Sequence, residues 1–375
     1  MIVRELIPTM ANLPKKGKAI ILTGPRQVGK TTILKTQFDQ NAAVLWLDGD
    51  DATIRQRLAN AGTSFLKSLV ANHPIVVIDE AQRIQDIGLI GKQLIDQIPG
   101  IELYITGSSA LEISGMTSEP MTGRKWSLQL YPLSFREMAN HHGLIDEISL
   151  VRQRLVFGYY PEIVVASGHE ARRLKELSES YLYKDIYSIE KIQKSDKFER
   201  LLKLLAYQIG QQVSYNELAV SAGLDVSTVG RYIDMLEKAF VVFRVPSFQR
   251  NKRNELKKSR KIYFTDNGIR NAVIEQWAPV EMRSDAGALW ENWIMSERRK
   301  LINNEQAKID MYFWRTIAQQ EVDLIEVSSN GIQAVEIKWN THKKFRVSAA
   351  FTNAYPEATT QCITPNNYES FLLEI

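Results

Sequence analysis

The segment Gly24-Pro-Arg-Gln-Val-Gly-Lys-Thr31 constrains the fold of this chain more than any other feature. It has the spacing G-x-x-x-x-G-K-[ST], and it lies between an apolar strand-like run and a helical pattern that begins at Thr32. In that context the glycines let the backbone wrap around phosphates, and Lys30 reaches the β- and γ-phosphates. The segment therefore predicts an ATP site, whose residues would be Gly24, Pro25, Arg26, Gln27, Val28, Gly29, Lys30, Thr31, Thr32 and Asp79.

Apolar runs of strand length alternate with helix-length segments through the first third of the chain. The runs are residues 18–23, 43–48, 75–79 and 101–106. Near-continuous apolar strands separated by helices are typical of a parallel sheet that is covered on both faces. The sequence therefore predicts an α/β fold with a P-loop parallel-sheet ATPase domain at its amino end.

An acidic pair ends the third of these runs, with its Asp 49 residues after Lys30. At the carboxyl end of a buried parallel strand, Asp79 and Glu80 would face the same crevice as the phosphate loop. Asp79 would then hold Mg²⁺ together with the Thr31 hydroxyl, and Glu80 would activate the attacking water. A pair of acids rather than a single Asp favours hydrolysis of ATP, because water needs a base.

Two further residues are weaker candidates for the same site. Ser108 follows the fourth strand-like run, where its hydroxyl would sense the γ-phosphate, although short hydroxyl residues at strand ends are also ordinary turn formers. Arg124 is a candidate charge-neutralising arginine, either within its own chain or across a subunit contact in a homo-oligomer. A plain surface arginine is an equally good interpretation of Arg124.

Composition narrows the class of protein. The chain has 375 residues, of which 44% are hydrophobic and 24% charged, the balance of an ordinary globular protein with more than one domain. The formal net charge is only +4, so any nucleic-acid surface must be local. The single cysteine, the lack of an apolar run of about 18 residues and the lack of a signal-peptide pattern predict a cytoplasmic protein that does not enter a membrane.

A helix-turn-helix pattern occupies residues 214–236. It opens with a capping box at Ser214, Gly223 can make the turn, and the second helix has apolar residues at helical spacing. Two strand-like runs follow, at residues 240–245 and 261–264. The pattern therefore predicts a winged helix.

The segment between those two strands is strongly basic. Residues 250–261 contain seven basic side chains and one acidic side chain. A basic wing beside a recognition helix suits phosphate contacts along DNA. The exposed face of the second helix offers only Arg231 as a strong reader, so sequence-specific recognition is not predicted, and a winged helix that contacts protein is the alternative.

A second group of chemically useful residues lies near the carboxyl end. Asp323 and Glu336 lie on strand-like runs joined by Ser328-Ser-Asn-Gly331, a good hairpin turn, and Lys338 shares a strand face with Glu336. Two carboxylates on neighbouring strands can hold Mg²⁺ or Mn²⁺ while the lysine positions a water, and Glu291 would supply a third carboxylate from a helix. The alternative is that these short patterns meet by chance on a solvated sheet face.

Together these motifs resemble a widespread prokaryotic family of AAA-type ATPases whose C-terminal region is of poorly assigned function. The resemblance rests on the phosphate loop, Asp79-Glu-Ala-Gln82, Thr106-Gly-Ser-Ser109, Gly123-Arg124, Tyr131-Pro-Leu-Ser-Phe-Arg-Glu137 and Gly158-Tyr-Tyr-Pro-Glu162. The Asp…Glu-x-Lys group resembles restriction-endonuclease-like nucleases, a domain for which this ATPase family is known. Two positions depart from the pattern: Tyr159 replaces a glycine, and Ser108 stands where many AAA-type ATPases have Asn.

The sequence thus predicts four segments: a P-loop ATPase core (1–137), a helical lid or linker (138–205), a winged helix (206–265) and a mixed α/β restriction-endonuclease-like domain (266–375). The first hypothesis is an ATP-driven enzyme that binds DNA through the winged helix and cuts it with a metal-dependent site. Its catalytic residues would be Glu80, Ser108, Arg124, Asp323, Glu336 and Lys338. The alternative is a nucleotide-controlled switch or scaffold whose C-terminal domain binds nucleic acid or protein without cleavage.

Overall fold

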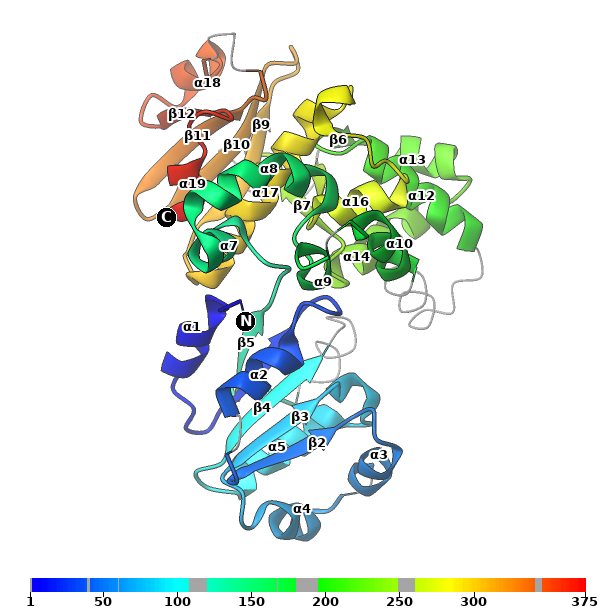
Figure 1. The fold of residues 1–375 in the computed structure, drawn as a ribbon, viewed down its shortest axis with the longest axis vertical. Helices are drawn as coiled ribbons and strands as arrows, with labels where there is room; N and C mark the ends of the chain where they lie inside the picture. Colours follow the sequence, from blue (N-terminus) through cyan, green and yellow to red (C-terminus); the bar gives the residue numbers. More distant parts are fainter. Residues whose placement is uncertain are drawn as a thin grey trace. The chain divides into compact units, whose positions relative to one another are not determined.

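The chain forms two compact units in the computed structural model (Figure 1). The structure describes residues 2–38, 41–59, 61–107, 120–166, 168–179, 195–248, 260–340 and 346–375. The N-terminal unit consists of Arg4–Pro132 and Lys238–Phe240, and the C-terminal unit consists of Met1–Val3, Leu133–Glu237 and Val241–Ile375. No helix within the described ranges is long and apolar enough to cross a membrane.

The N-terminal unit is built on a five-stranded sheet. Its elements in chain order are α1 (Leu6–Asn12), β1 (Ala19–Thr23), α2 (Lys30–Phe38), β2 (Val44–Asp48), α3 (Ala52–Leu58), α4 (Thr63–Val70), β3 (Ile75–Asp79), the 3-10 helix η1 (Ala81–Arg83), α5 (Ile87–Gln97), β4 (Glu102–Gly107) and β5 (Lys125–Gln129). The strand order is β2-β3-β4-β1-β5, and every neighbouring pair is parallel. The predicted parallel sheet is confirmed, with its first four strands at the four apolar runs.

Both faces of this sheet are covered, because successive side chains of each strand point to opposite sides. On one face Val76 of β3 and Ile105 of β4 belong to a buried cluster that includes Leu94 of α5. On the other face the ring of Tyr104 packs edge-on against Phe38 of α2, with ring centroids 4.9 Å apart. Burial on both faces explains why the strand sequences are continuously apolar rather than alternating.

The C-terminal unit combines helices with two small sheets. Its elements are α7 (Phe135–His142), α8 (Leu144–Phe157), α9 (Pro161–Val164), α10 (Glu170–Ser178), α12 (Ser195–Tyr207), β6 (Gln212–Val213), α13 (Tyr215–Ala222), α14 (Val226–Lys238), β7 (Val242–Pro246), β8 (Arg260–Phe264), α16 (Asn267–Val273), the 3-10 helix η3 (Val280–Met282), α17 (Ala286–Asn304), β9 (Asp310–Arg315), β10 (Glu321–Ser328), β11 (Gly331–Ile337), α18 (Ala349–Ala354), β12 (Thr359–Ile363) and α19 (Glu369–Leu373). One sheet has the antiparallel order β6-β8-β7. The other has the order β12-β11-β10-β9, in which only β11 and β12 are parallel to each other.

The segment Gly158-Tyr-Tyr-Pro-Glu162 is fixed to the start of α16. The backbone N–H of Tyr159 donates a hydrogen bond to the buried Asp266 carboxylate, with an N···Oδ2 distance of 2.7 Å. A Cβ atom at Gly158 would lie 2.0 Å from Asp266 Oδ1, and the backbone φ of +71° also favours glycine. This motif therefore has a structural role, which is to hold the end of α8 against α16.

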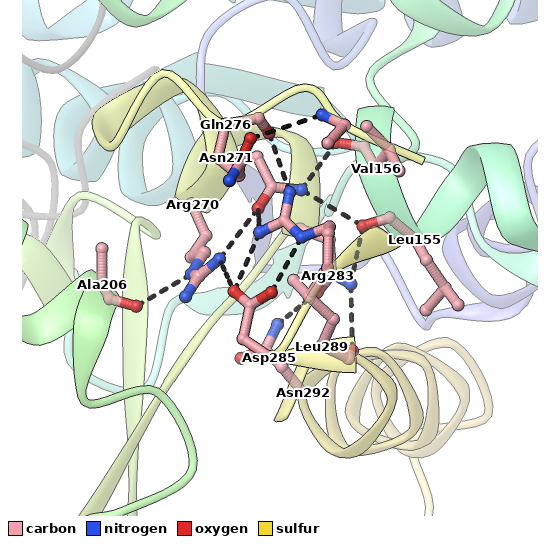
Figure 2. Close-up of polar contacts among 12 residues, drawn as sticks. Leu155, Val156, Ala206, Arg270, Asn271, Gln276, Arg283, Asp285, Leu289 and Asn292 are labelled. Atoms are coloured by element: carbon pink, nitrogen blue, oxygen red, sulfur yellow. Dashed lines mark hydrogen bonds and ion pairs between the residues drawn. The ribbon is translucent and has the colours of Figure 1, made fainter. Parts of the chain in front are cut away.

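A network of arginine, aspartate and amide side chains, most of them buried, joins four helices of the C-terminal unit (Figure 2). Arg270 of α16 donates from Nη1 to Asp285 Oδ2 at 2.6 Å and from Nε to the Ala206 carbonyl oxygen of α12 at 2.8 Å. Asn271 Nδ2 donates to the Val156 carbonyl oxygen of α8 at 2.8 Å. Because Asp285 directly precedes α17, the network fixes α8, α12, α16 and α17 around one another.

Asn292 of α17 extends this network to β8. Its Oδ1 atom accepts a hydrogen bond from the Phe264 N–H at 2.7 Å, and its Nδ2 atom donates to the Phe264 carbonyl oxygen at 3.0 Å. The side chain thereby substitutes for a neighbouring strand at the end of β8. The preceding residue of α17, Glu291, is in this way held against the side chains of β8.

Candidate functional site

The phosphate loop joins β1 to the amino end of α2, at the carboxyl edge of the parallel sheet. The loop backbone has a positive φ at Gln27 (59°) and Gly29 (96°), which curls the chain ahead of the helix. A Cβ atom at Gly24 would lie 2.1 Å from the Leu130 carbonyl oxygen, so only glycine fits at this position. The loop therefore leads into a helix N-terminus, whose unpaired N–H groups attract anions.

Lys30 is the first residue of α2 and lies inside this loop. Its side chain is buried, and its Nζ atom donates hydrogen bonds to the Gly24 carbonyl oxygen at 3.1 Å and the Pro25 carbonyl oxygen at 2.7 Å. These two hydrogen bonds hold the ammonium in the centre of the loop. That position is suited to binding a phosphate.

Asp79, at the end of β3, is held beside the phosphate loop by three hydrogen bonds. The Thr31 hydroxyl donates to Asp79 Oδ2 at 2.7 Å. The hydroxyl of Thr106, a fully buried residue of β4, donates to Asp79 Oδ1, which also accepts from the Glu80 N–H at 3.2 Å. The structure thus brings together Thr31 and Asp79, both predicted as magnesium ligands, and it adds Thr106, which the sequence analysis did not select.

Glu80 follows directly and has a left-handed backbone conformation, with φ of 46° and ψ of 42°. Its backbone carbonyl would lie 2.4 Å from a Cβ at Gly49, so the end of β2 approaches it closely. Gln82 Nε2 donates to Glu80 Oε2 at 2.6 Å. A strained backbone and a fixed carboxylate are features that cluster at functional sites.

Arg4 supports the phosphate loop from outside the predicted site. Its buried guanidinium donates from Nη1 to the Val28 carbonyl oxygen and from Nη2 to the Tyr131 carbonyl oxygen, both at 2.6 Å. The two carbonyls lie 24 and 127 residues away along the chain. No local sequence signal distinguishes an arginine that acts at such separations.

The two weaker candidates have different outcomes. Ser108 lies outside the described residues. Arg124 lies just before β5, whose first residue pairs with Ala19, the first residue of β1, so it is at the opposite end of the sheet from the phosphate loop. Its Nε atom forms an ion pair with Asp96 Oδ1 at 2.6 Å. The structure therefore does not bring Arg124 to the ATP site of its own chain, and a role across a subunit contact stays a prediction.

A second site forms in the C-terminal unit, where all four residues of the predicted carboxylate–lysine group converge. Lys338, directly after β11, forms ion pairs with Asp323 Oδ2 of β10 and Glu336 Oε2 of β11, each at 2.7 Å. The Ile337 N–H also donates to Asp323 Oδ2, at 2.9 Å. Glu291 of α17 joins this group through Lys261.

Lys261 of β8 lies between the carboxylates and was not predicted as part of this site. Its Nζ atom is 3.0 Å from Glu291 Oε1, 2.5 Å from Glu321 Oε1 and 4.0 Å from Asp323 Oδ1. The Tyr263 hydroxyl donates to the same Glu291 oxygen at 2.7 Å. We call Lys261, Glu291, Glu321, Asp323, Glu336 and Lys338 the carboxylate–lysine cluster.

Burial and charge shift several pKa values in this cluster. Burial, together with the charge of Asp323, raises the pKa of Glu336 to about 7. Burial opposes ionisation of Asp323, but the charges of Lys261 and Lys338 outweigh it and hold the Asp323 pKa below its usual value. For Lys261, three neighbouring carboxylates outweigh burial and raise the pKa. Lys261 therefore stays charged, and burial also raises the pKa of Glu291 above its usual value.

The carboxylates of the cluster do not fit a divalent metal as they lie. Across the described ranges, no group of three or more His, Cys, Asp or Glu side chains is arranged to hold a metal ion. The Lys261 ammonium lies between Glu291 and Asp323, and Lys338 bridges Asp323 and Glu336. The structure places Glu291, Asp323 and Glu336, the predicted metal ligands, as ion-pair partners of two lysines.

The region predicted as a winged helix, residues 206–265, has α13 and α14 followed by the antiparallel β7 and β8, and most of α12 precedes it. On α14 the charged side chains exposed to solvent are Arg231, Asp234 and Lys238, which amount to one net positive charge. The basic segment predicted as the wing falls mostly on residues 249–259, which lie outside the described residues. The helix face alone therefore presents little charge to a polyanion.

Known protein families match three parts of the chain. Residues 16–139 match a family described as an AAA domain. Residues 148–279 and 286–371 match two families that are each described as a domain of unknown function, DUF8612 and DUF4143. The AAA match spans the phosphate loop, Asp79 and Glu80, so these residues lie in the part of the chain that is similar to AAA domains and that has a P-loop ATPase fold.

Similar proteins occur in bacteria and archaea. An uncharacterized protein of Mycobacterium tuberculosis, Rv2008c, is 27% identical over 327 residues, which cover 86% of this chain and 70% of that protein. An uncharacterized protein of Methanocaldococcus jannaschii, MJ1544, is 22% identical over 348 residues, which cover 85% and 74%. Neither name assigns an activity.

Two solved structures show weaker likeness. The crystal structure of Pif1 helicase from Candida albicans has 13% identity and a TM-score of 0.25, with 48% of each chain covered. The structure of Drosophila ORC bound to AT-rich DNA and Cdc6 has 12% identity and a TM-score of 0.25, with 73% of this chain and 91% of that chain covered. These TM-scores are too low to bear on function.

Proposed function

We propose that this chain binds and hydrolyses ATP with Mg²⁺, and that its C-terminal unit engages DNA without cutting it. The hydrogen bond of 2.7 Å between the Thr31 hydroxyl and Asp79 Oδ2, beside the buried ammonium of Lys30, carries the first part. Hydroxyl and carboxylate oxygens are the ligand types that Mg²⁺ prefers. The residues present therefore fit a Mg²⁺-nucleotide.

The chain's own groups have separable roles in this proposal. Lys30 would exchange the carbonyls of Gly24 and Pro25 for phosphate oxygens, and Thr31 and Asp79 would hold Mg²⁺. When bound, Mg²⁺ offsets phosphate charge and so favours attack at the γ-phosphorus. The Glu80 carboxylate, oriented by Gln82, would accept a proton from the attacking water.

Replacing Lys30 by Ala tests the nucleotide site. A charge-assisted hydrogen bond contributes about 1.5–3 kcal/mol, so ATP affinity should fall by about 10- to 150-fold. Binding of a fluorescent ATP analogue to the full chain measures this. Lys35→Ala, an exposed lysine on the same helix, is the matched control and should bind as the parent does. Equal binding by parent and Lys30→Ala would contradict the assignment of the phosphate loop.

The DNA part of the proposal is supported by the helices and strands of residues 195–264 and by the basic segment at 250–261. Non-specific DNA binding comes mainly from phosphate contacts by lysine and arginine. Of this segment, the structure describes Arg260 and Lys261. The guanidinium carbon of Arg260 lies 4.9 Å from the centre of the Tyr215 ring. That contact leaves Arg260 half-buried at the edge of the small sheet.

Neutralising Arg253, Lys257, Lys258 and Arg260 together should weaken DNA binding equally for every sequence. The slope of log affinity against log salt should fall by about 0.9 for each lost phosphate contact, up to about 4 in total. Fluorescence anisotropy with unrelated duplexes measures both quantities. Removing the three positive charges of Arg172, Arg173 and Lys175 on α10 is the control for a loss of positive charge elsewhere, and it should leave the slope unchanged.

Salt-independent or absent DNA binding in the parent chain would favour the alternative, a winged helix that contacts protein.

Cleavage of DNA by the carboxylate–lysine cluster is a second candidate function. The convergence of Asp323, Glu336 and Lys338 favours it. The position of Lys261 opposes it, because the Lys261 ammonium lies between Glu291 and Asp323.

A further inference from the structure

Lys261 occupies the centre of the carboxylate–lysine cluster. Its Nζ atom contacts Glu291 and Glu321 directly and lies 4.0 Å from Asp323 Oδ1. These carboxylates come from α17 and β10, while the lysine comes from the separate sheet β6-β8-β7. The arrangement places one cation among oxygen ligands from several elements, as a metal ion would be placed.

The lysine is fixed in this position. Its backbone lies within β8, where it pairs with Gln212 of β6 on one side and Val245 of β7 on the other. The side chain is 1% exposed, and its ammonium lies 5.7 Å from the centre of the Phe313 ring. Lys261 therefore cannot leave the cluster by a rotation into solvent.

We propose that Lys261 is the resident cation of this cluster and takes the place of a divalent metal. While Lys261 is present, Glu291 and Asp323 cannot bind Mg²⁺ or Mn²⁺ at their shared position, because the ammonium and the metal would repel each other at close range. The inference rests on the proposed non-cutting role of the C-terminal unit and gives a reason for it. The Lys261 ammonium fills the position beside Glu291 and Asp323 that the metal ion of a nuclease-like site would need.

Mn²⁺ titration followed by electron paramagnetic resonance tests this inference. The full chain carries Asp79→Asn and no nucleotide is added, so that the phosphate loop does not contribute a site. In this background, Asp323→Asn should leave the Mn²⁺ isotherm unchanged. Lys261→Met, which keeps the length of the side chain and removes its charge, should add one site at least about tenfold tighter than the remaining weak binding. Adding Asp323→Asn should abolish that site.

Lys261→Arg is the matched control, because it keeps a cation and should add no Mn²⁺ site. An Asp323-dependent site in the chain that retains Lys261 overturns the proposal, as does a folded Lys261→Met chain without a new site. If Lys261→Met does not fold by circular dichroism, Lys261→Gln, which is also neutral but can still donate a hydrogen bond to Glu291, replaces it, and the same gain is expected. ATP turnover is measured separately, so that its absence counts against the ATPase proposal alone.

Plasmid nicking separates the two proposals further. The parent chain should not nick supercoiled DNA in Mg²⁺ or Mn²⁺. Nicking that Asp323→Asn abolishes would overturn both the resident-cation inference and the non-cutting role. If the chain that retains Lys261 binds no DNA and has no Asp323-dependent Mn²⁺ site, the DNA proposal fails. The proposed role of Lys261 then still stands.

Discussion

Replacing Glu80 by Gln is expected to leave ATP binding intact and to lower ATP turnover by at least about a hundredfold, since a general base contributes about 10²- to 10⁴-fold. The amide keeps the size of the side chain but cannot accept a proton from water. The left-handed backbone at Glu80 and the hydrogen bond from Gln82 both fix the side chain. The loss should therefore fall on the rate of hydrolysis and not on nucleotide affinity.

Steady-state phosphate release and binding of a fluorescent ATP analogue, measured on the same preparations, separate these two effects. Asp86→Asn is the matched control: Asp86 is exposed, follows η1, and also has a left-handed backbone, with φ of 54°. It should turn over ATP at the parent rate. Parent-like turnover by Glu80→Gln would show that another residue activates the water.

The parallel sheet was predictable because strands that are buried on both faces have continuously apolar sequences. Residues 43–48 and 75–79, for example, are continuously apolar until the acid at the strand end. The fifth strand, β5, was not recognised, because it lies at the edge of the sheet and reads Lys-Trp-Ser-Leu-Gln. Only Leu128 of β5 is buried, so no apolar run marks this strand.

The contact between Thr31 and Asp79 was predictable from motifs, whereas the contacts of Lys261 were not. Thr31 and Asp79 are separated by 48 residues, but each belongs to a motif with known spacing. Lys261 shows the opposite case: in the sequence it is one of seven basic residues in an apparent wing, whereas in the structure it is buried among acids 30 or more residues away. A charge run does not reveal which of its members the fold turns inward.

Arg298→Met is expected to destabilise the C-terminal unit by about 3–5 kcal/mol, the usual cost of removing one partner of a buried ion pair. Arg298 of α17 donates from Nε and Nη2 to the two carboxylate oxygens of Glu326 at 2.8 and 2.9 Å. Both residues are 4% exposed. Its Nη1 atom also donates to the Phe371 carbonyl oxygen of α19 at 2.7 Å. The substitution would leave Glu326 charged, buried and without this partner.

Urea unfolding followed by tryptophan fluorescence measures the change, because five of the seven tryptophans lie in the C-terminal unit. Arg172→Met, which breaks an exposed pair with Glu176 on α10, is the control and should shift the unfolding free energy by no more than about 0.5 kcal/mol. Adding Glu326→Gln to Arg298→Met should recover part of the loss, because the buried charge is then gone. A midpoint for Arg298→Met equal to that of the Arg172→Met control would mean that the ion pair contributes nothing net, and that the apolar contacts of α17 alone hold α19 and β10 in place.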